Sequence, residues 1–388
     1  MSKQRLPPLL LLCHRDNMKT EKILDIQHRT ERKTYMVHQY KNNGYNILLD
    51  VNSGSVHVVD DLIYDMVPYY KEKGLDETVA LLKDKYPEAE IREAAEDLDE
   101  LIKAGKLYTE DIYENYIHDI VEAKKPVVKA LCLHIAHDCN LACRYCFAEE
   151  GEYHGRRALM SYEVGKKALD FLVANSGSRK NLEVDFFGGE PTMNFEVVKQ
   201  LVEYGRSIEE ANNKKFRFTL TTNGILLNDE ILDFANKEMS NIVLSIDGRK
   251  EINDLMRPTR NNHGSSYDII MPKFKKVAES RNQMNYYVRG TFTHNNLDFS
   301  EDVLHLADEG FEQISVEPVV AQPTDSYAIR EEDIPVLCEQ YDILAKEIIK
   351  RKKAGKGFNF FHFMIDINGG PCVAKRLSGC GSGCEYLA

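Results

Sequence analysis

The second half of the chain alternates between two patterns of apolar positions. Short runs with a period of two predict β-strands, and the longer stretches between them have the 3.6-residue period of amphipathic helices. Parallel neighbours need long crossover connections, so this order predicts an α/β fold, a partial (β/α)6 TIM-like barrel. The expected strands are residues 130–136, 183–187, 216–221, 242–246, 286–293 and 313–317, with helices at 161–174, 195–209, 229–236 and 299–309 among the connections.

An earlier unit, residues 33–108, has a different pattern. Three strands joined by the turns Asn42-Asn43-Gly44 and Asn52-Ser53-Gly54 precede three helices, a winged-helix-like α+β arrangement. The expected strands are 35–40, 45–51 and 55–59, and the expected helices are 61–70, 75–85 and 88–104.

The last of these helices is rich in Glu and Asp, which would repel phosphate, so DNA binding is the weakest interpretation of this unit. A small sheet with an exposed edge can instead capture an extended peptide by strand addition. A purely structural domain is the third interpretation. We expect an N-terminal tail at 1–32, a linker at 109–129, the barrel at 130–355 and a C-terminal extension at 356–388.

Composition limits the classes of function. The 388 residues are 43% hydrophobic and 29% charged, with a formal net charge of −12. Such a charge argues against a nucleic-acid partner, and no apolar run approaches the roughly 18 residues of a membrane-spanning helix. The apolar run at residues 9–12 is short and has no small-residue cleavage site after it, so we expect a cytoplasmic protein.

Six of the nine cysteines form two groups. Cys139, Cys143 and Cys146 follow the first barrel strand, where α/β folds place their chemistry. Clustering of this kind favours metal or iron–sulfur ligation over disulfides. Three thiolates can bind three irons of a [4Fe–4S] cubane and leave the fourth iron without a protein ligand. The alternative is a structural zinc site, for which His134 and His137 are near in sequence, although such sites usually need four ligands.

The CxxxCxxC loop after a first strand resembles the signature of the radical S-adenosylmethionine (SAM) superfamily. Phe147 matches the family's aromatic residue after the third cysteine and is expected to cover the adenine. The sequence after the second strand resembles the family's GGEP motif, with Glu190 expected to accept from the SAM ammonium. That motif consists of Gly188, Gly189, Glu190 and Pro191.

Two more motifs strengthen the resemblance. Thr222-Asn223-Gly224 follows the third strand, which implies that Asn223 lies near the SAM ribose or carboxylate. Ser245 closes the fourth strand and Arg257 follows it; in related peptide-modifying members the corresponding pair holds the SAM carboxylate. The alternative is that Ser245 and Asp247 only make a turn.

The second group, Cys372, Cys380 and Cys384, lies among glycines and resembles the start of a SPASM-type extension, which implies an auxiliary [4Fe–4S] cluster. The later cysteines of such an extension are absent before Ala388, so we expect a truncated extension.

The whole arrangement resembles the maturases of SCIFF peptides. This implies reductive cleavage of SAM to a 5′-deoxyadenosyl radical and a thioether between a cysteine sulfur and an α-carbon of a cysteine-rich precursor peptide. The peptide would be bound through its leader at residues 45–59, and an external reductant such as flavodoxin or ferredoxin would supply one electron. Two alternatives remain: a sulfatase-maturing enzyme that oxidises a protein Cys or Ser, and an iron–sulfur redox sensor.

Overall fold

The computed structural model describes residues 35–113, 127–260, 264–364, 381–383 and 385–388. The chain divides into two compact units, one containing the described residues 35–113 and the other containing the rest of the described chain. Each unit has its own hydrophobic core. Among the described residues, no helix has the length and apolar character needed to cross a membrane.

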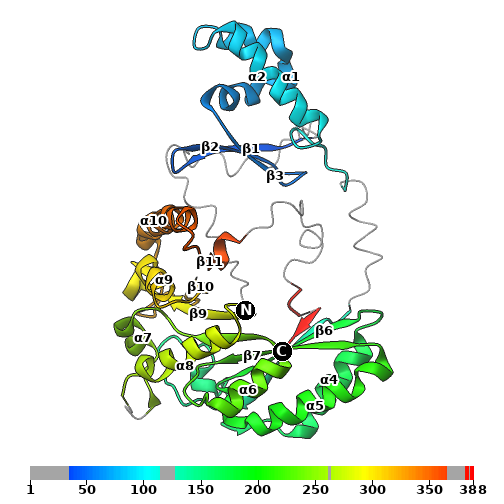
Figure 1. Cartoon of the computed structure of the whole chain (residues 1–388), viewed down its shortest axis with the longest axis vertical. Helices are drawn as coiled ribbons and strands as arrows, with labels where there is room; N and C mark the ends of the chain where they lie inside the picture. Colours follow the sequence, from blue (N-terminus) through cyan, green and yellow to red (C-terminus); the bar gives the residue numbers. More distant parts are fainter. Residues whose placement is uncertain (1–34, 114–126, 261–263, 365–380, 384) are drawn as a thin grey trace. The chain divides into compact units, whose positions relative to one another are not determined.

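The first unit is a three-stranded antiparallel sheet followed by two helices (Figure 1). Leu48 on the central strand packs into a core with Met66, Ile91 and Leu98 from the helices, and all four are buried. Gly74 interrupts the first helix with φ 75° and ψ 177°, near the helix boundary expected from the sequence. The elements are β1 (Val37–Asn42), β2 (Tyr45–Asp50), β3 (Ser55–Val59), α1 (Asp61–Leu82) and α2 (Glu88–Lys103).

This unit extends past residue 108, into the segment expected to be a linker. The backbone N–H of Thr109 donates to Asp50 at 3.0 Å, and Asn52 donates to the carbonyl of Thr109 at 2.7 Å. Tyr35 and Glu110 also form an antiparallel bridge. The buried carboxylate of Asp50 therefore fixes Thr109 to the sheet, and the bridge to Tyr35 holds Glu110.

The second unit contains the expected α/β sheet. Its six longer strands are neighbours in chain order and all pair in parallel, with order β4-β6-β7-β8-β9-β10. Two short strands that were not expected extend the sheet, β11 beside β10 and β12 beside β4, while β5 pairs antiparallel with β4. The strands are β4 (Ala130–His137), β5 (Ala158–Leu159), β6 (Asn181–Gly188), β7 (Lys215–Thr222), β8 (Met239–Ser245), β9 (Tyr286–Phe292), β10 (Gln313–Pro318), β11 (Asn359–Phe360) and β12 (Tyr386–Leu387).

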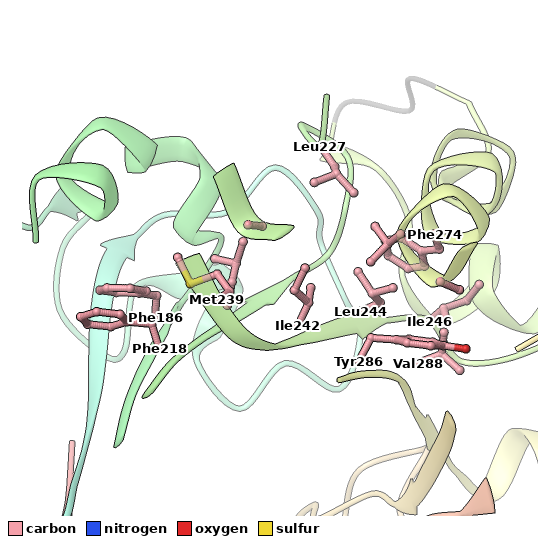
Figure 2. Packing of buried hydrophobic residues seen from close by; sticks show 14 of the residues in the cluster. Phe186, Phe218, Leu227, Met239, Ile242, Leu244, Ile246, Phe274, Tyr286 and Val288 are labelled. Atoms are coloured by element: carbon pink, nitrogen blue, oxygen red, sulfur yellow. The ribbon is translucent and has the colours of Figure 1, made fainter. Parts of the chain in front are cut away.

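The helices of this unit pack against one face of the sheet. Alternate strand residues such as Phe186, Phe218 and Leu244 have no exposed surface and form one continuous core with helical residues such as Phe274 (Figure 2). Since side chains alternate along a strand, the opposite face carries the remaining, mostly polar positions. The helices are α4 (Tyr162–Asn175), α5 (Phe195–Asn212), α6 (Asp229–Glu238), α7 (Lys250–Met256), α8 (Ser266–Ser280), α9 (Phe299–Asp308) and α10 (Ile334–Lys353).

Candidate functional site

The three-cysteine loop begins where β4 ends, at the carboxyl edge of the parallel sheet. Cys139 is 8% exposed, and Cys143 and Cys146 are half-buried. The N–H of Cys146 donates to the carbonyl of Cys143 at 3.1 Å, which gives the second half of the motif a tight turn. The loop therefore presents its thiols from a structured backbone.

A second segment, residues 256–260, lies along this loop and holds it. Leu141 and Thr259 form an antiparallel bridge, and the N–H groups of Ala142 and Arg144 donate to carbonyls of this segment at 2.9 Å. Arg260 adds side-chain contacts to Asp138 at 3.1 Å and to Glu150 at 2.8 Å. Arg257 belongs to the same segment, so the expected SAM-carboxylate ligand is carried by the backbone that holds the cysteines.

The two glycines after β6 let the backbone pass close to the cysteine loop. A Cβ on Gly189 would lie 2.1 Å from the carbonyl oxygen of Asp138, and one on Gly188 would lie 2.5 Å from that of Ala136. Gly188 also has φ +124°, which side chains rarely adopt. Their shared role in this structure is close packing of β6 against the start of the loop.

Glu190 is fully buried and accepts hydrogen bonds from the neighbouring turn. Its Oε1 accepts from the N–H and hydroxyl of Thr192 at 3.0 and 2.5 Å, and from the hydroxyl of Thr222 at 2.7 Å. Its Oε2 accepts from the N–H of Asn223 at 2.7 Å. Glu190 has no exposed surface, and its hydrogen bonds join the GGEP segment to the end of β7. Its contact with the SAM ammonium stays a prediction.

Asn223 connects the end of β7 to the cysteine loop. Its side-chain amide donates to the sulfur of Cys139 at 3.5 Å and to Asn140 at 2.7 Å. The side-chain Oδ1 of Asn223 accepts from the backbone N–H of Ile225 at 3.1 Å. The sequence placed Asn223 near SAM, and the structure brings it to the first cluster cysteine.

Arg257, Tyr145 and Asp247 form a buried network beside Cys143. The Tyr145 hydroxyl donates to both carboxylate oxygens of Asp247 at 2.7 and 2.8 Å, and Arg257 donates to that hydroxyl at 2.7 Å. Sequence interpretation missed Tyr145, although it lies inside the cysteine motif. Asp247 is more than a turn residue, because it is fully buried and positions this network. Ser245 lies half-buried at the end of β8, two residues before Asp247.

An aromatic group covers another side of the loop. Tyr153 stacks on His134 with ring centroids 4.3 Å apart and meets the edge of Phe147 at 6.1 Å. Phe147 is 70% exposed, so its ring is free to cover a ligand, as expected for an adenine contact. The stacking of His134 gives this histidine a packing role.

The donor set suits a cubane better than a single zinc ion. In the described part of the chain, no three His, Cys, Asp or Glu side chains converge closely enough to share one metal ion. Thiolates on a cubane bind different irons, so they need not converge on one ion. The expected auxiliary ligands Cys372, Cys380 and Cys384 lie outside the described residues.

Unpaired polar atoms gather around the cysteine loop. The described residues have four buried side-chain nitrogen or oxygen atoms without a hydrogen-bond partner, on Asn140, Tyr153, Arg257 and Arg260. A buried polar group without a partner is costly, so such groups mark a place where a ligand completes the bonding. Guanidinium and amide N–H groups fit the carboxylate of an amino acid. The site therefore fits a [4Fe–4S] cluster with SAM beside it.

Burial favours the protonated form of the Cys139 and Cys143 thiols. Desolvation, with a contribution from Glu190, raises the pKa of Cys139 to about 12. Desolvation also raises the pKa of Cys143 to about 11, although Arg257 acts against this increase. Because thiolates are the ligands of iron, the positive charge of the metal has to compensate for this burial.

Comparisons with known proteins agree with this geometry. Residues 128–271 match a family of 4Fe-4S single cluster domains. The radical SAM cyclopropyl synthase TigE of Paramaledivibacter caminithermalis is 22% identical over 82% of this chain and 72% of its own length. A cysteine-type anaerobic sulfatase-maturating enzyme of Clostridium novyi is 29% identical over 38% of this chain and 40% of its own.

Two further comparisons concern length and fold. A Methanocaldococcus jannaschii protein without an assigned function is 29% identical over 48% of this chain, and the match spans less than two thirds, 62%, of that relative. The structure of native anSMEcpe with bound AdoMet superimposes with a TM-score of 0.53 at 19% identity, over 61% of this chain and 65% of the other, which shows a shared fold. Together these matches show a likeness to radical SAM proteins and support a [4Fe–4S] cluster and SAM as the cofactors of this chain.

Proposed function

We propose that this chain is a peptide maturase that joins a cysteine sulfur to an α-carbon of a cysteine-rich precursor peptide. The observation that supports the proposal is the sheet of the first unit, which has an exposed apolar face and an unpaired edge strand among the described residues. The same chain also contains the cysteine loop. A domain that only supported the fold would have no need of an apolar sheet face turned to solvent. Such a face, next to a free strand edge, suits capture of an extended peptide.

The candidate peptide-binding surface is the edge strand β3 with the adjoining face of β2. Val56 and Val58 are 40% and 66% exposed, and they pair across the sheet with Leu49 and Ile47 on the same face. Among the described residues, β3 pairs only with β2, so its other edge has free backbone donors and acceptors. An added strand would use those groups, and its apolar side chains would cover the valines.

The relatives support a peptide or protein as the substrate. TigE aligns over most of this chain, and the sulfatase-maturating enzymes modify a protein, as their name states. A leader-binding surface favours a precursor peptide over a folded sulfatase. The acidic helix α2, with Glu90, Glu93 and Glu100 exposed, disfavours DNA as the partner of this unit.

When bound, the cluster and SAM supply a 5′-deoxyadenosyl radical that removes a hydrogen atom from the substrate. The residues of this chain hold and orient the reactants. Cys139, Cys143 and Cys146 would hold the cluster, Arg257 would bind the SAM carboxylate through its unpaired Nε, and Phe147 would cover the adenine. The electron that cleaves SAM would come from an external one-electron donor such as flavodoxin or ferredoxin. The electron released when the cysteine sulfur, having lost its proton, joins the α-carbon radical would pass to an iron–sulfur cluster of the enzyme.

The test is anaerobic reconstitution with iron and sulfide, followed by dithionite and SAM, with 5′-deoxyadenosine as the readout. We expect product from the wild type, none from Cys143→Ala and wild-type amounts from Cys132→Ala, because Cys132 lies on β4 outside the loop. Absence of product from a protein that contains its cluster would overturn the enzymatic proposal and favour a redox sensor.

Cysteine-rich peptides encoded near the gene are then added. Formation of a thioether would lower the mass of the peptide by two hydrogen atoms and leave one fewer thiol that can be alkylated. Loss of two hydrogens with all thiols retained would indicate carbon–carbon bond formation instead. A new carbonyl that reacts with hydrazide would indicate oxidation of the sulfatase-maturing kind.

A further inference from the structure

The face of the parallel sheet opposite to the core has two adjoining cavities, and the larger one is lined by both polar and apolar residues. Along β6, Val184 and Phe186 are buried under the helices, so the intervening Glu183 and Asp185 point to the other face. A cavity of ≈ 490 Å³ there is lined by Asp185, and a neighbouring one of ≈ 290 Å³ shares Glu183 and Thr219 with it. Cavities of this size are large enough to bind a small ligand or part of a peptide.

Three of the cations on this face already have anionic partners. Arg217 pairs with Glu183 on the neighbouring strand at 3.2 Å, and Arg289 pairs with Glu317 at 3.0 Å. Lys129 pairs with Glu385 at 2.9 Å. Of the two cations that line the larger cavity, Lys129 is neutralised in this way, whereas Arg179 has no carboxylate partner within salt-bridge distance among the described residues.

Asp185 differs from the other carboxylates on this face. It is half-buried in the middle of β6, and the hydroxyl of Thr221 donates to it at 3.1 Å. In the described part of the chain no cation forms a salt bridge with it, and Arg289 acts on it only at longer range. Burial raises the pKa of Asp185 to about 6, so the ionised form at neutral pH lacks a close counter-charge.

We propose that Asp185 is a substrate-binding residue whose carboxylate accepts hydrogen bonds from a cationic N–H group of the peptide, an amidinium-like or ammonium group held in this cavity. Burial of a carboxylate is costly without a partner, and a cationic donor removes that cost. The inference rests on the proposed function, because it assigns the peptide to this face of the sheet.

The position of the Asp185 carboxylate suits a cationic group of the peptide that lies at some distance from the reacting α-carbon. Asp185 precedes Gly188 by three residues, so it lies about 10 Å along the strand from the motif beside the cysteine loop. A peptide with its reacting residue at the loop would reach Asp185 through a neighbouring side chain. The cavity would therefore select the sequence around the modified residue.

The test uses reconstituted holoenzyme with SAM and two small probes, acetamidinium and inorganic phosphate, with binding measured by ligand-observed NMR. The variants are Asp185→Asn, the charge-retaining Asp185→Glu and the control Asp308→Asn on α9, whose carboxylate pairs with Arg351 away from the sheet. Iron content shows that each variant is intact, and Asp185→Ser replaces the Asn variant if that protein loses its cluster.

We expect millimolar acetamidinium binding to the wild type, at least about ten-fold weaker binding to Asp185→Asn, and little change in Asp308→Asn and Asp185→Glu. Phosphate should not bind saturably. Equal acetamidinium binding to wild type and Asp185→Asn, or phosphate binding that depends on this face, would overturn the proposal. If acetamidinium binding depended on Asp185 but no peptide stimulated 5′-deoxyadenosine formation, the cation-binding site would be supported and the maturase function would be rejected.

Discussion

The carboxylate of Glu190 accepts a hydrogen bond of 2.7 Å from the backbone N–H of Asn223, which connects the ends of β6 and β7. Asn223 in turn donates to the sulfur of Cys139 at 3.5 Å. The GGEP segment, the TNG turn and the first cluster cysteine are thus one continuous hydrogen-bonded unit. A substitution at Glu190 should therefore also affect how well the cluster is bound.

Replacing Glu190 with Gln should destabilise the protein by about 2–3 kcal/mol, because the amide NH2 cannot accept from the donors that surround it. We expect a lower denaturant midpoint and less iron retained after reconstitution. Glu196→Gln, at an exposed position on α5, is the matched control. An unchanged midpoint and full iron content would mean that the buried carboxylate has no structural role.

Replacing Tyr145 with Phe should weaken SAM binding by about ten-fold while iron content is kept, because Arg257 loses the hydroxyl that positions it. Equilibrium dialysis with labelled SAM measures the effect. Tyr204→Phe removes a hydroxyl that donates to Asp170 on α4 and serves as the control. The role of Tyr145 would be rejected if both variants bound SAM like the wild type.

Replacing Gly189 with Ala should prevent the cysteine loop from closing, since its Cβ would lie 2.1 Å from a backbone oxygen that cannot move freely. Iron bound per chain and the cluster absorbance should both fall several-fold. Gly357→Ala is the control, because its Cβ would meet its nearest neighbour at an ordinary 3.4 Å. Normal cluster content in Gly189→Ala would contradict this close packing.

Replacing Val58 with Glu should abolish leader-peptide binding, since a charge on the edge strand opposes strand addition. Fluorescence anisotropy with a labelled precursor peptide measures binding, and peptide-independent cleavage of SAM should remain. Leu81→Glu, at a 48% exposed position on α1 of the same unit, is the control. Equal affinity in both variants would exclude β3 as the binding edge.

Replacing Asp185 with Asn should stabilise the protein at pH 8. The pKa of this carboxyl is raised to about 6 by burial, so its ionisation favours the unfolded chain, and the cost grows as the pH rises through 6. After allowance for partial exposure we expect a gain of about 1–2 kcal/mol at pH 8 that shrinks toward pH 5. Urea unfolding at pH 5 and pH 8 measures this gain in unfolding free energy. A gain that did not change with pH would contradict ionisation of Asp185 as its cause.

The strands of the main sheet could be predicted because their residues alternate between a helix-covered face and a polar face. Phe216, Phe218 and Leu220 show this on β7, where all three are buried. Strands β11 and β12 could not be predicted, since two residues carry no periodicity and only pairing with β10 and β4 defines them.

The candidate site shows the same division. The cysteines and the GGEP and TNG motifs are contiguous in sequence and could be found there. Contacts between Tyr145 and Asp247, or between Arg260 and Asp138, join residues about a hundred or more positions apart and follow only from the fold. Glu190 could be identified from its motif. Its burial could not, because it depends on the packing of the segment after β6 against the end of β7.

The bridge between Leu141 and Thr259 also sets an order of events during synthesis. The cysteines leave the ribosome long before the segment that holds their loop, and closing so large a chain loop takes place only after β6, β7 and β8 have been made. Until then the three thiols belong to an unfixed loop. Iron is therefore best delivered to this protein late, after most of the sheet has formed.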